Sequence, residues 1–185
     1  DSRRSTAFVK AVGKGTMVEA PDVNGLPGGI AVEKFLALAA APRARMNVST
    51  EDLPLIEIPA ERKEKPFFAV FISGDGGWAS IDKEIGEVLV QNGVSVVGVD
   101  ALRYFWTKKT PQEGAKDLER IIKDHIDSWS KDQVVLIGYS LGADVLPPMY
   151  NNLSPELQAK VKKVVLLNAA QTTDMQVHLT DWIGL

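Results

Sequence analysis

The chain has 185 residues, enough for one domain with a substantial core, and 45% of them are apolar, which is typical of a globular rather than a disordered protein. The net charge of −3 argues against a nucleic-acid-binding protein, and the absence of cysteine excludes disulfides and thiolate metal sites. No apolar run of about 18 residues occurs, so we expect no transmembrane helix.

Residues 1–65 differ from the rest of the chain because glycine and proline recur throughout them. They hold one predicted helix, over residues 30–41, and a short predicted strand, over residues 53–59. Pro54 and Pro59 favour an edge position for this strand, because proline has no N–H to donate to a neighbouring strand. We interpret residues 1–65 as a linker or the tail of a preceding module, and residues 66–185 as a separate domain.

From residue 66 onward, predicted strands alternate with predicted helices. The strands cover residues 67–73, 94–99, 133–138 and 163–167. The first helix is predicted to be capped by Ser80, with an apolar face of Ile81, Ile85, Val88 and Leu89. The next helix begins with a capping box at residues 110–113, where proline occupies the first helical position. This alternation implies an α/β domain built on a parallel sheet.

The segment Gly138–Asp144 contains the pattern Gly-x-Ser-x-Gly. It lies between a predicted strand and a predicted helix, the context in which this pattern indicates a nucleophile elbow. The sharp turn lifts the hydroxyl of Ser140 out of the backbone at the carboxyl end of a parallel strand. Glycines are needed on both sides because a Cβ would crowd the turn. The alternative is a purely structural turn, and we favour the nucleophile.

A nucleophilic serine of this kind needs two backbone N–H groups for the oxyanion that forms on the substrate. One is expected from Leu141, the residue after the nucleophile. The other is expected from the glycine-rich loop at residues 74–78, with Asp75 or Gly76 as the donor. The alternative is a strand-to-helix turn in which the glycines are needed only because the backbone adopts positive φ angles.

The serine also needs a histidine base and an acid that orients the base. Only His178 follows Ser140, and it lies four residues from Asp174, directly after the last predicted strand, whereas the usual acid and base end two later strands. We therefore interpret His178 as a surface histidine and His125, on a sheet-facing helix, as a structural one. A simpler hypothesis is that the domain is incomplete at its C-terminus, and that roughly 50 to 70 further residues carry the acid and the base.

Asp100 ends the second predicted strand of this domain, at the edge of the sheet where ligands gather in α/β folds. The segment after it places three consecutive aromatics beside three cations. Arg103 is a candidate for binding phosphate, and Tyr104 and its aromatic neighbours for binding apolar chains. The alternative is that these aromatics only cover the end of the sheet. Asp144, one helical turn beyond Ser140, is expected to contact substrate or to brace the elbow.

Three blocks of sequence resemble the bacterial VirJ/AcvB virulence-protein family: Ser73–Trp78, Val97–Trp106 and Ile137–Asp144. They follow the order found in the family, and residues 171–184 also resemble its segment after the fourth strand. The resemblance implies an α/β-hydrolase-type domain that is exported to the periplasm of Gram-negative bacteria.

AcvB-like members are linked to hydrolysis of lysyl-phosphatidylglycerol, so the resemblance implies that Ser140 attacks an aminoacyl ester and forms an acyl-enzyme. Asp75 or Asp144 is then expected to receive the lysyl ammonium, and Trp78 is counted among the substrate contacts. No cofactor or metal is expected. The implied partners are an aminoacylated phospholipid or another ester, a peripherally contacted membrane and type IV secretion components, but no nucleic acid.

Two other functions stay open at this point. One is a non-catalytic periplasmic factor that assists type IV secretion. The Gly-x-Ser-x-Gly pattern weighs against it, because an adaptor has no need of an exposed serine on a strained turn. The other is a generic esterase or thioesterase with a different acyl substrate.

Overall fold

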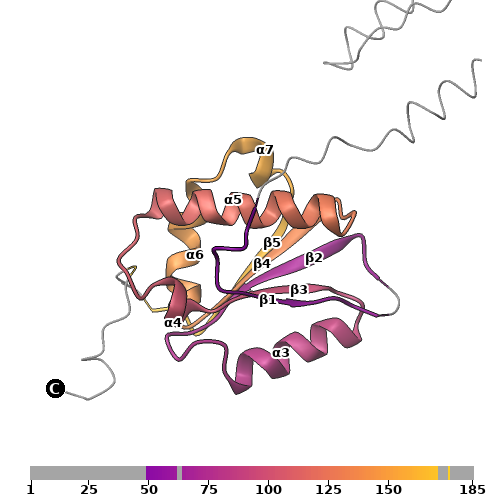
Figure 1. Cartoon of the computed structure of the whole chain (residues 1–185), viewed down its shortest axis with the longest axis horizontal. Helices are drawn as coiled ribbons and strands as arrows, with labels where there is room; N and C mark the ends of the chain where they lie inside the picture. Colours follow the sequence, from indigo (N-terminus) through magenta and orange to yellow (C-terminus); the bar gives the residue numbers. More distant parts are fainter. Residues whose placement is uncertain (1–48, 62–63, 171–174, 176–185) are drawn as a thin grey trace, which may run out of the picture. The chain divides into compact units, whose positions relative to one another are not determined.

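A computed structural model describes residues 49–61, 64–170 and 175. The elements of this part of the chain form a sheet with helices on both faces (Figure 1). The strands are β1 (Leu55–Ile58), β2 (Phe67–Ile72), β3 (Val96–Val99), β4 (Gln133–Tyr139) and β5 (Val161–Leu167). The helices are α3 (Ser80–Gln91), α4 (Ala101–Tyr104), α5 (Pro111–Ser128), α6 (Leu141–Asn151) and α7 (Pro155–Gln158).

The strand order is β1-β3-β2-β4-β5, and the last four of these strands run parallel to one another. This confirms the predicted α/β fold with a mainly parallel sheet. β1 lies at one edge and pairs antiparallel with β3. The sheet therefore includes residues on both sides of the predicted boundary at residue 65. The predicted helix over residues 30–41 lies outside the described residues.

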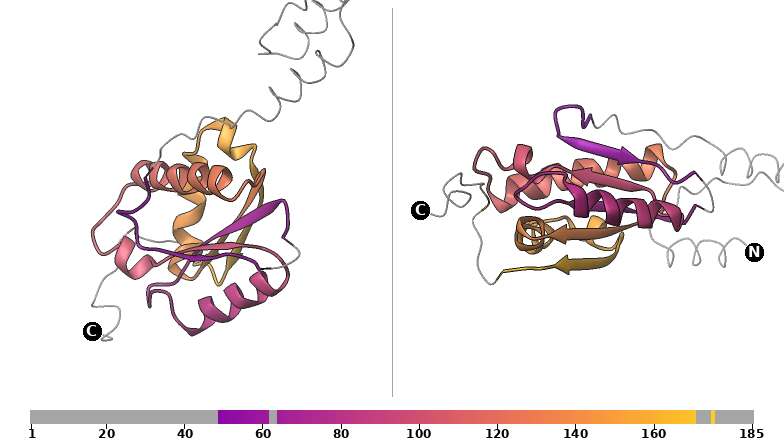
Figure 2. Two further views of the ribbon diagram at one scale, coloured as in Figure 1. Left: turned by 45° about the vertical axis from the view of Figure 1, so that its right-hand side comes forward. Right: turned by 90° about the horizontal axis from the view of Figure 1, so that it is seen from below.

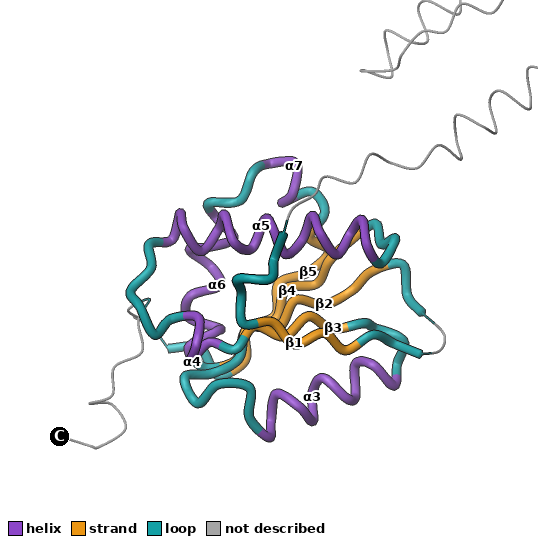
Figure 3. The backbone as a smooth tube through the Cα atoms, in the orientation of Figure 1, coloured by secondary structure: helices purple, strands orange, loops and turns teal. Residues whose placement is uncertain are grey.

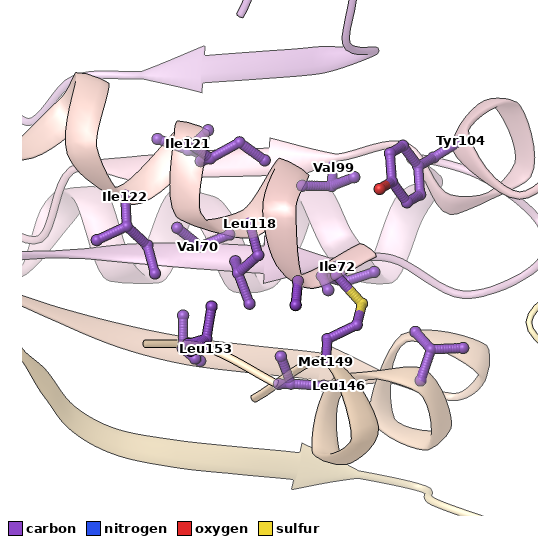
Figure 4. Close-up of a cluster of buried hydrophobic side chains, with 14 of the residues drawn as sticks. Val70, Ile72, Val99, Tyr104, Leu118, Ile121, Ile122, Leu146, Met149 and Leu153 are labelled. Atoms are coloured by element: carbon purple, nitrogen blue, oxygen red, sulfur yellow. The ribbon is translucent and has the colours of Figure 1, made fainter. Parts of the chain in front are cut away.

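The sheet has a core on each face. Helices α5, α6 and α7 cover one face and α3 covers the other (Figures 1 and 2). Figure 4 shows the core beneath α5 and α6, and its labelled members include Val70, Ile72, Leu118, Ile122 and Leu146. Strands β2 and β3 are buried on both faces, which explains why their sequences are nearly continuous in apolar residues.

Helix α5 begins as its capping box predicts. The Thr110 hydroxyl accepts a hydrogen bond from the Glu113 N–H at 3.2 Å, and the Glu113 carboxylate accepts one from the Thr110 N–H at 2.8 Å. The hydrogen bond from the Thr110 backbone holds the pKa of Glu113 below its ordinary value. Such a cap stabilises a helix by about 1 kcal/mol.

The predicted apolar face of α3 is partly wrong. Ile81 and Val88 are exposed (43% and 58%), whereas Asp82 and Gly86 are buried. The helix is capped by Ala79 rather than Ser80, and the N–H of Ala79 donates to the Asp82 carboxylate at 3.1 Å. The face that carries Asp82 and Gly86 packs toward the sheet, where a Cβ on Gly86 would lie 3.5 Å from Ile58, so two of the apolar residues face solvent. No helix in the described part of the chain is long and apolar enough to cross a membrane.

Candidate active site

Ser140 occupies a strained turn between β4 and α6. Its φ and ψ are 51° and −119°, a region in which a residue with a side chain costs about 1–3 kcal/mol. The N–H of Ser140 donates to the carbonyl oxygen of Leu167 at 2.9 Å, and the N–H of Gly142 donates to the carbonyl oxygen of Ser73 at 3.1 Å. These two bonds tie the turn to the strands on either side, so the surrounding structure maintains the strain.

Both glycines of the motif are required by close approach of the backbone. A Cβ on Gly142 would lie 2.1 Å from the carbonyl oxygen of Ile72. A Cβ on Gly138 would lie 2.3 Å from the carbonyl oxygen of Gly142. Neither distance is compatible with a side chain, so α6 leaves the sheet at this angle only with glycine at both positions. This geometry agrees with the nucleophile elbow predicted from the sequence.

A second turn, Gly74–Gly77, lies beside the elbow. The N–H of Gly77 donates to the carbonyl oxygen of Gly74 at 3.0 Å, and this bond leaves Asp75 and Gly76 exposed at the tip. A Cβ placed on Gly74 would be 3.4 Å from the Cβ of Ser140. The turn therefore lies at the carboxyl end of β2, next to the serine. It belongs to the loop between β2 and α3, which Figure 3 draws in teal.

The candidate oxyanion donors are the N–H groups of Leu141 and of Asp75 or Gly76. Within the described part of the chain, no hydrogen bond uses the N–H of Leu141, Asp75 or Gly76. Leu141 is the first residue of α6, so its N–H lies at the positive end of the helix dipole. The structure thus brings the candidate nucleophile and the predicted donors to one end of the sheet.

Ser73 joins the three strand ends that form the site, a role that the sequence did not reveal. Its buried hydroxyl accepts a hydrogen bond from the Ala101 N–H at 2.9 Å and donates one to the Gly74 carbonyl at 3.2 Å. Its own carbonyl accepts the bond from Gly142 described above. The only signal for this residue in the sequence was its position at the end of a buried strand.

Trp78 was expected to contact substrate, and the structure places it elsewhere. Its indole packs under α3, edge-on to Phe71 with the ring centroids 5.4 Å apart. It also lies over Gly98 of β3, where a Cβ would meet the indole at 2.5 Å. Trp78 therefore anchors the Gly74–Gly77 turn to the sheet.

Tyr104 was also expected to face substrate, and this too needs correction. Its side chain is buried, and its hydroxyl donates to Asp117 of α5 at 2.6 Å. Burial, together with this hydrogen bond to a carboxylate, raises the pKa of the Tyr104 hydroxyl far above its ordinary value. Phe105 is fully buried as well, so only Trp106 of the three aromatics is exposed. The alternative, that the aromatics cover the end of the sheet, therefore holds for Tyr104 and Phe105.

Asp100 and Arg103 occupy α4 and its cap. The Asp100 carboxylate accepts a hydrogen bond from the Arg103 N–H at 3.1 Å, and therefore caps this short helix. The Arg103 side chain is 78% exposed, with its Nε 3.7 Å from Asp100. Leu102, Arg103 and Trp106 line an open groove of about 410 Å³. Arg103 is thus available to a ligand, whereas Asp100 has a structural task.

Asp144 braces the elbow from the first turn of α6. Its carboxylate accepts a hydrogen bond from the N–H of Ala170, after β5, at 2.5 Å. Of the two roles expected for Asp144, the structure therefore shows the bracing one. Asp75, by contrast, has an exposed position at the tip of its turn.

The described residues place no histidine beside Ser140. His125 is buried on α5, where its Nδ1 lies 2.8 Å from the carbonyl oxygen of Ile121 and its ring stacks on Phe68 near the start of β2. It belongs to the end of the sheet opposite the elbow and is structural, as expected. His178 and Asp174 lie outside the described residues. Among the described residues, no cluster of acidic and histidine side chains is suited to hold a metal ion.

Comparisons with known proteins identify one family. A model of the family described as bacterial virulence protein (VirJ) matches residues 66–185. A search of curated proteins found no match.

Three solved structures with some likeness to the chain are described as hydrolytic enzymes or as proteins of the hydrolase fold. A probable hydrolytic enzyme from Pseudomonas aeruginosa PAO1 is 15% identical, with a TM-score of 0.47, over 62% of this chain and 36% of that chain. The monoacylglycerol lipase of Paleococcus ferrophilus is 18% identical, with a TM-score of 0.46, over 65% and 44%. An alpha/beta hydrolase fold protein of unknown function is 15% identical, with a TM-score of 0.48, over 62% and 39%. The chain spans less than half the length of each, and at these TM-scores nothing about its activity is inferred from them.

Proposed function

The chain belongs to the VirJ family of bacterial virulence proteins, and from this premise we propose that it carries the nucleophile of a serine ester hydrolase. The observation that supports the proposal most is the backbone of Ser140. A non-glycine residue is held at φ 51° between a parallel strand and a helix, with two glycines placed so that no other residue fits. Ser130 and Asn168 also have positive φ, so the support comes from the combination at Ser140 of φ 51°, ψ −119° and a turn closed by two obligatory glycines.

In the proposed reaction the Ser140 hydroxyl attacks the carbonyl carbon of an ester. The carbonyl oxygen becomes an oxyanion, which accepts hydrogen bonds from the N–H of Leu141 and from that of Asp75 or Gly76. Loss of one such donor costs about 2.7–4 kcal/mol of transition-state stabilisation. Collapse of the intermediate releases the alcohol and leaves an acyl-enzyme, which water then hydrolyses. We propose that the histidine base and its acid lie outside the described residues.

The substrate that we propose is an aminoacyl ester of a phospholipid, of the lysyl-phosphatidylglycerol type. Asp75 supports this choice, because its exposed carboxylate lies at the tip of the turn beside Ser140 and is available to an ammonium group. Arg103 supports it with an exposed guanidinium for the lipid phosphate. The family resemblance adds a periplasmic location, which belongs to the same proposal.

A fluorophosphonate probe tests the nucleophile. We expect the natural protein to be labelled, and Ser140→Ala to abolish the labelling. Ser130 is a matched control, because it also has φ 51° and is exposed, but lies after α5, away from the elbow. Ser130→Ala should leave the labelling intact. Labelling that persists in Ser140→Ala would contradict the proposed role.

The other two functions make different predictions. A protein that the probe never labels would favour the non-catalytic factor that assists type IV secretion. For the substrate, lipid extracts of cells with and without the protein are compared. We expect the aminoacyl phospholipid to accumulate when the protein is absent. Unchanged levels together with a labelled Ser140 would leave the generic esterase or thioesterase.

A further inference from the structure

We propose that Leu102, Arg103, Trp106 and Lys108 form a surface, here called the α4 patch, that docks on an anionic lipid membrane. The proposal concerns where the protein meets a membrane rather than which bond it cleaves. It depends on the proposed function in one respect: a lipid substrate gives the protein a reason to bind a membrane. Its physical basis is the exposure of Arg103, Trp106 and Lys108, the two positive charges among them, and the position of Leu102 beside the Gly74–Gly77 turn.

The α4 patch is held from beneath by its buried neighbours. Tyr104 and Phe105 lie in the core, and the Tyr104 hydroxyl is bonded to Asp117. The ammonium of Lys109 lies 4.5 Å from the centre of the Tyr104 ring and 3.7 Å from Asp117. These contacts fix the backbone, so Arg103 before the buried pair and Trp106 and Lys108 after it are exposed on a firm support.

Trp106 supplies the apolar part of the patch. Its side chain is 56% exposed, and it lines the open groove together with Leu102 and the Arg103 stem. Tryptophan at an exposed position beside cations is typical of surfaces that enter the headgroup region of a bilayer, because the ring is apolar and its N–H can still bond to polar groups. A water-exposed position gives the ring no comparable stabilisation.

The charge of the patch is opposite to that of the chain. The protein carries a net charge of −3, yet residues 101–109 contain three cations and no acid. Arg103 is 78% exposed and Lys108 is exposed, so both can reach lipid phosphates. An anionic membrane attracts clustered Lys and Arg, so Lys108 and Arg103, which also lies beside Asp100, favour approach by this side.

The patch lies next to the candidate active site. A Cβ on Gly77 would be 3.3 Å from the Cβ of Leu102, and Gly77 is bonded to Gly74, which adjoins Ser140. Figure 1 shows α4 at the same end of the sheet as the loop between β2 and α3. A protein docked through the α4 patch therefore holds Ser140 close to the headgroup region, where an ester of a lipid headgroup lies.

Co-sedimentation with vesicles tests the proposal. We expect the chain to bind mixed phosphatidylcholine–phosphatidylglycerol vesicles and to bind pure phosphatidylcholine vesicles much more weakly. Trp106→Ala should lower the partition coefficient roughly tenfold. Arg103→Ala and Lys108→Ala should each lower it roughly fivefold. Added salt should weaken binding, because it screens the lipid charge.

Matched variants away from the patch serve as controls. Val88→Ala removes an exposed apolar side chain from α3, and Lys163→Ala removes an exposed cation from β5. Both should bind as the wild type does. Ser140→Ala should also bind normally, which separates docking from catalysis. Circular dichroism confirms that each variant is folded.

Three outcomes would overturn the proposal. One is binding that shows no preference for phosphatidylglycerol. Another is equal loss of binding in the control variants and the patch variants. The third is binding to soluble polyglutamate as tight as to vesicles, which would indicate an acidic protein partner. Failure of vesicle binding with intact fluorophosphonate labelling removes this inference alone, whereas unlabelled protein that still binds vesicles removes the proposed function alone.

Discussion

Two turns meet at the carboxyl end of the sheet, and they keep their shapes by different means. The elbow at Ser140 is fixed by backbone against backbone, because its flanking glycines leave no room for a Cβ. The Gly74–Gly77 turn is held at its base by its own Gly77–Gly74 hydrogen bond, by the Ser73 hydroxyl and by the Trp78 indole, while its tip at Gly76 has open space around it. The nucleophile is therefore held rigidly, whereas the turn that supplies the second oxyanion donor is anchored at its base and accessible at its tip.

Substitution at the elbow should have the largest effect. In Gly142→Ala the new Cβ meets the Ile72 carbonyl oxygen at 2.1 Å, so α6 must move away from β2. We expect the free energy of unfolding to fall by about 3 kcal/mol or more, with loss of labelling at Ser140. Urea denaturation measures the first quantity. Wild-type stability in this variant would mean that the elbow adjusts freely to a side chain. The elbow would then be no more rigid than the Gly74–Gly77 turn.

The anchor of the second turn is tested by a double-mutant cycle. Gly98→Ala forces a Cβ into the Trp78 indole, and we expect a loss of about 1–3 kcal/mol in the free energy of unfolding. Trp78→Ala removes the clash together with the anchor. The combined variant should therefore cost at least about 1 kcal/mol less than the sum of the single variants. Additive costs would show that the indole does not rest on Gly98.

Asp82 tests the cap that follows the second turn. It is buried, and its Oδ1 has no hydrogen-bond partner in the described part of the chain. Burial raises the pKa of Asp82 above its ordinary value of 3.8. Because the folded pKa exceeds the unfolded one, the contribution of Asp82 to stability is complete below the unfolded pKa and is lost as pH rises through the folded pKa.

Asp82→Asn keeps an oxygen that can accept the Ala79 N–H and removes the ionisation. As pH rises from about 4 to about 7, the stability of the wild type should therefore decline relative to this variant. Urea denaturation across that range measures the difference. A constant difference between the two proteins would contradict a raised pKa.

The tip of the second turn should show the smallest effect. A Cβ on Gly76 has no atom within 4 Å, so Gly76→Ala should change the free energy of unfolding by no more than about 0.5 kcal/mol. Gly77→Ala is the neighbouring contrast, because Gly77 has φ +75° and its Cβ would lie 3.0 Å from Asp100. That variant should cost about 1 kcal/mol or more. Thermal unfolding of the two distinguishes them, and equal losses would contradict the open tip.

The features that the sequence predicted well are those determined by a few consecutive residues. The elbow around Ser140 and the capping box at Thr110 are local patterns, since the bonds and contacts that define them involve near neighbours in the chain or a strand end. The parallel sheet followed from the alternation of apolar runs, and β1 took the edge position that Pro54 favours.

The features that it missed depend on contacts between distant elements. Trp78 is partly buried because β3 has a glycine, Gly98, under its ring, and Tyr104 is buried because α5 offers Asp117 to its hydroxyl. Trp106 has the same residue type as Trp78 and is exposed. Composition cannot separate such cases, because the partner that decides burial lies twenty residues away in one case and thirteen in the other.

The most direct test of the account is the position of a covalent adduct. After reaction of the natural protein with a fluorophosphonate, peptide mapping by mass spectrometry locates the modified serine. A single adduct on Ser140 is the result that the structure predicts, with none in Ser140→Ala. No adduct, or an adduct on another serine that survives Ser140→Ala, would contradict the central claim that this elbow carries a nucleophile.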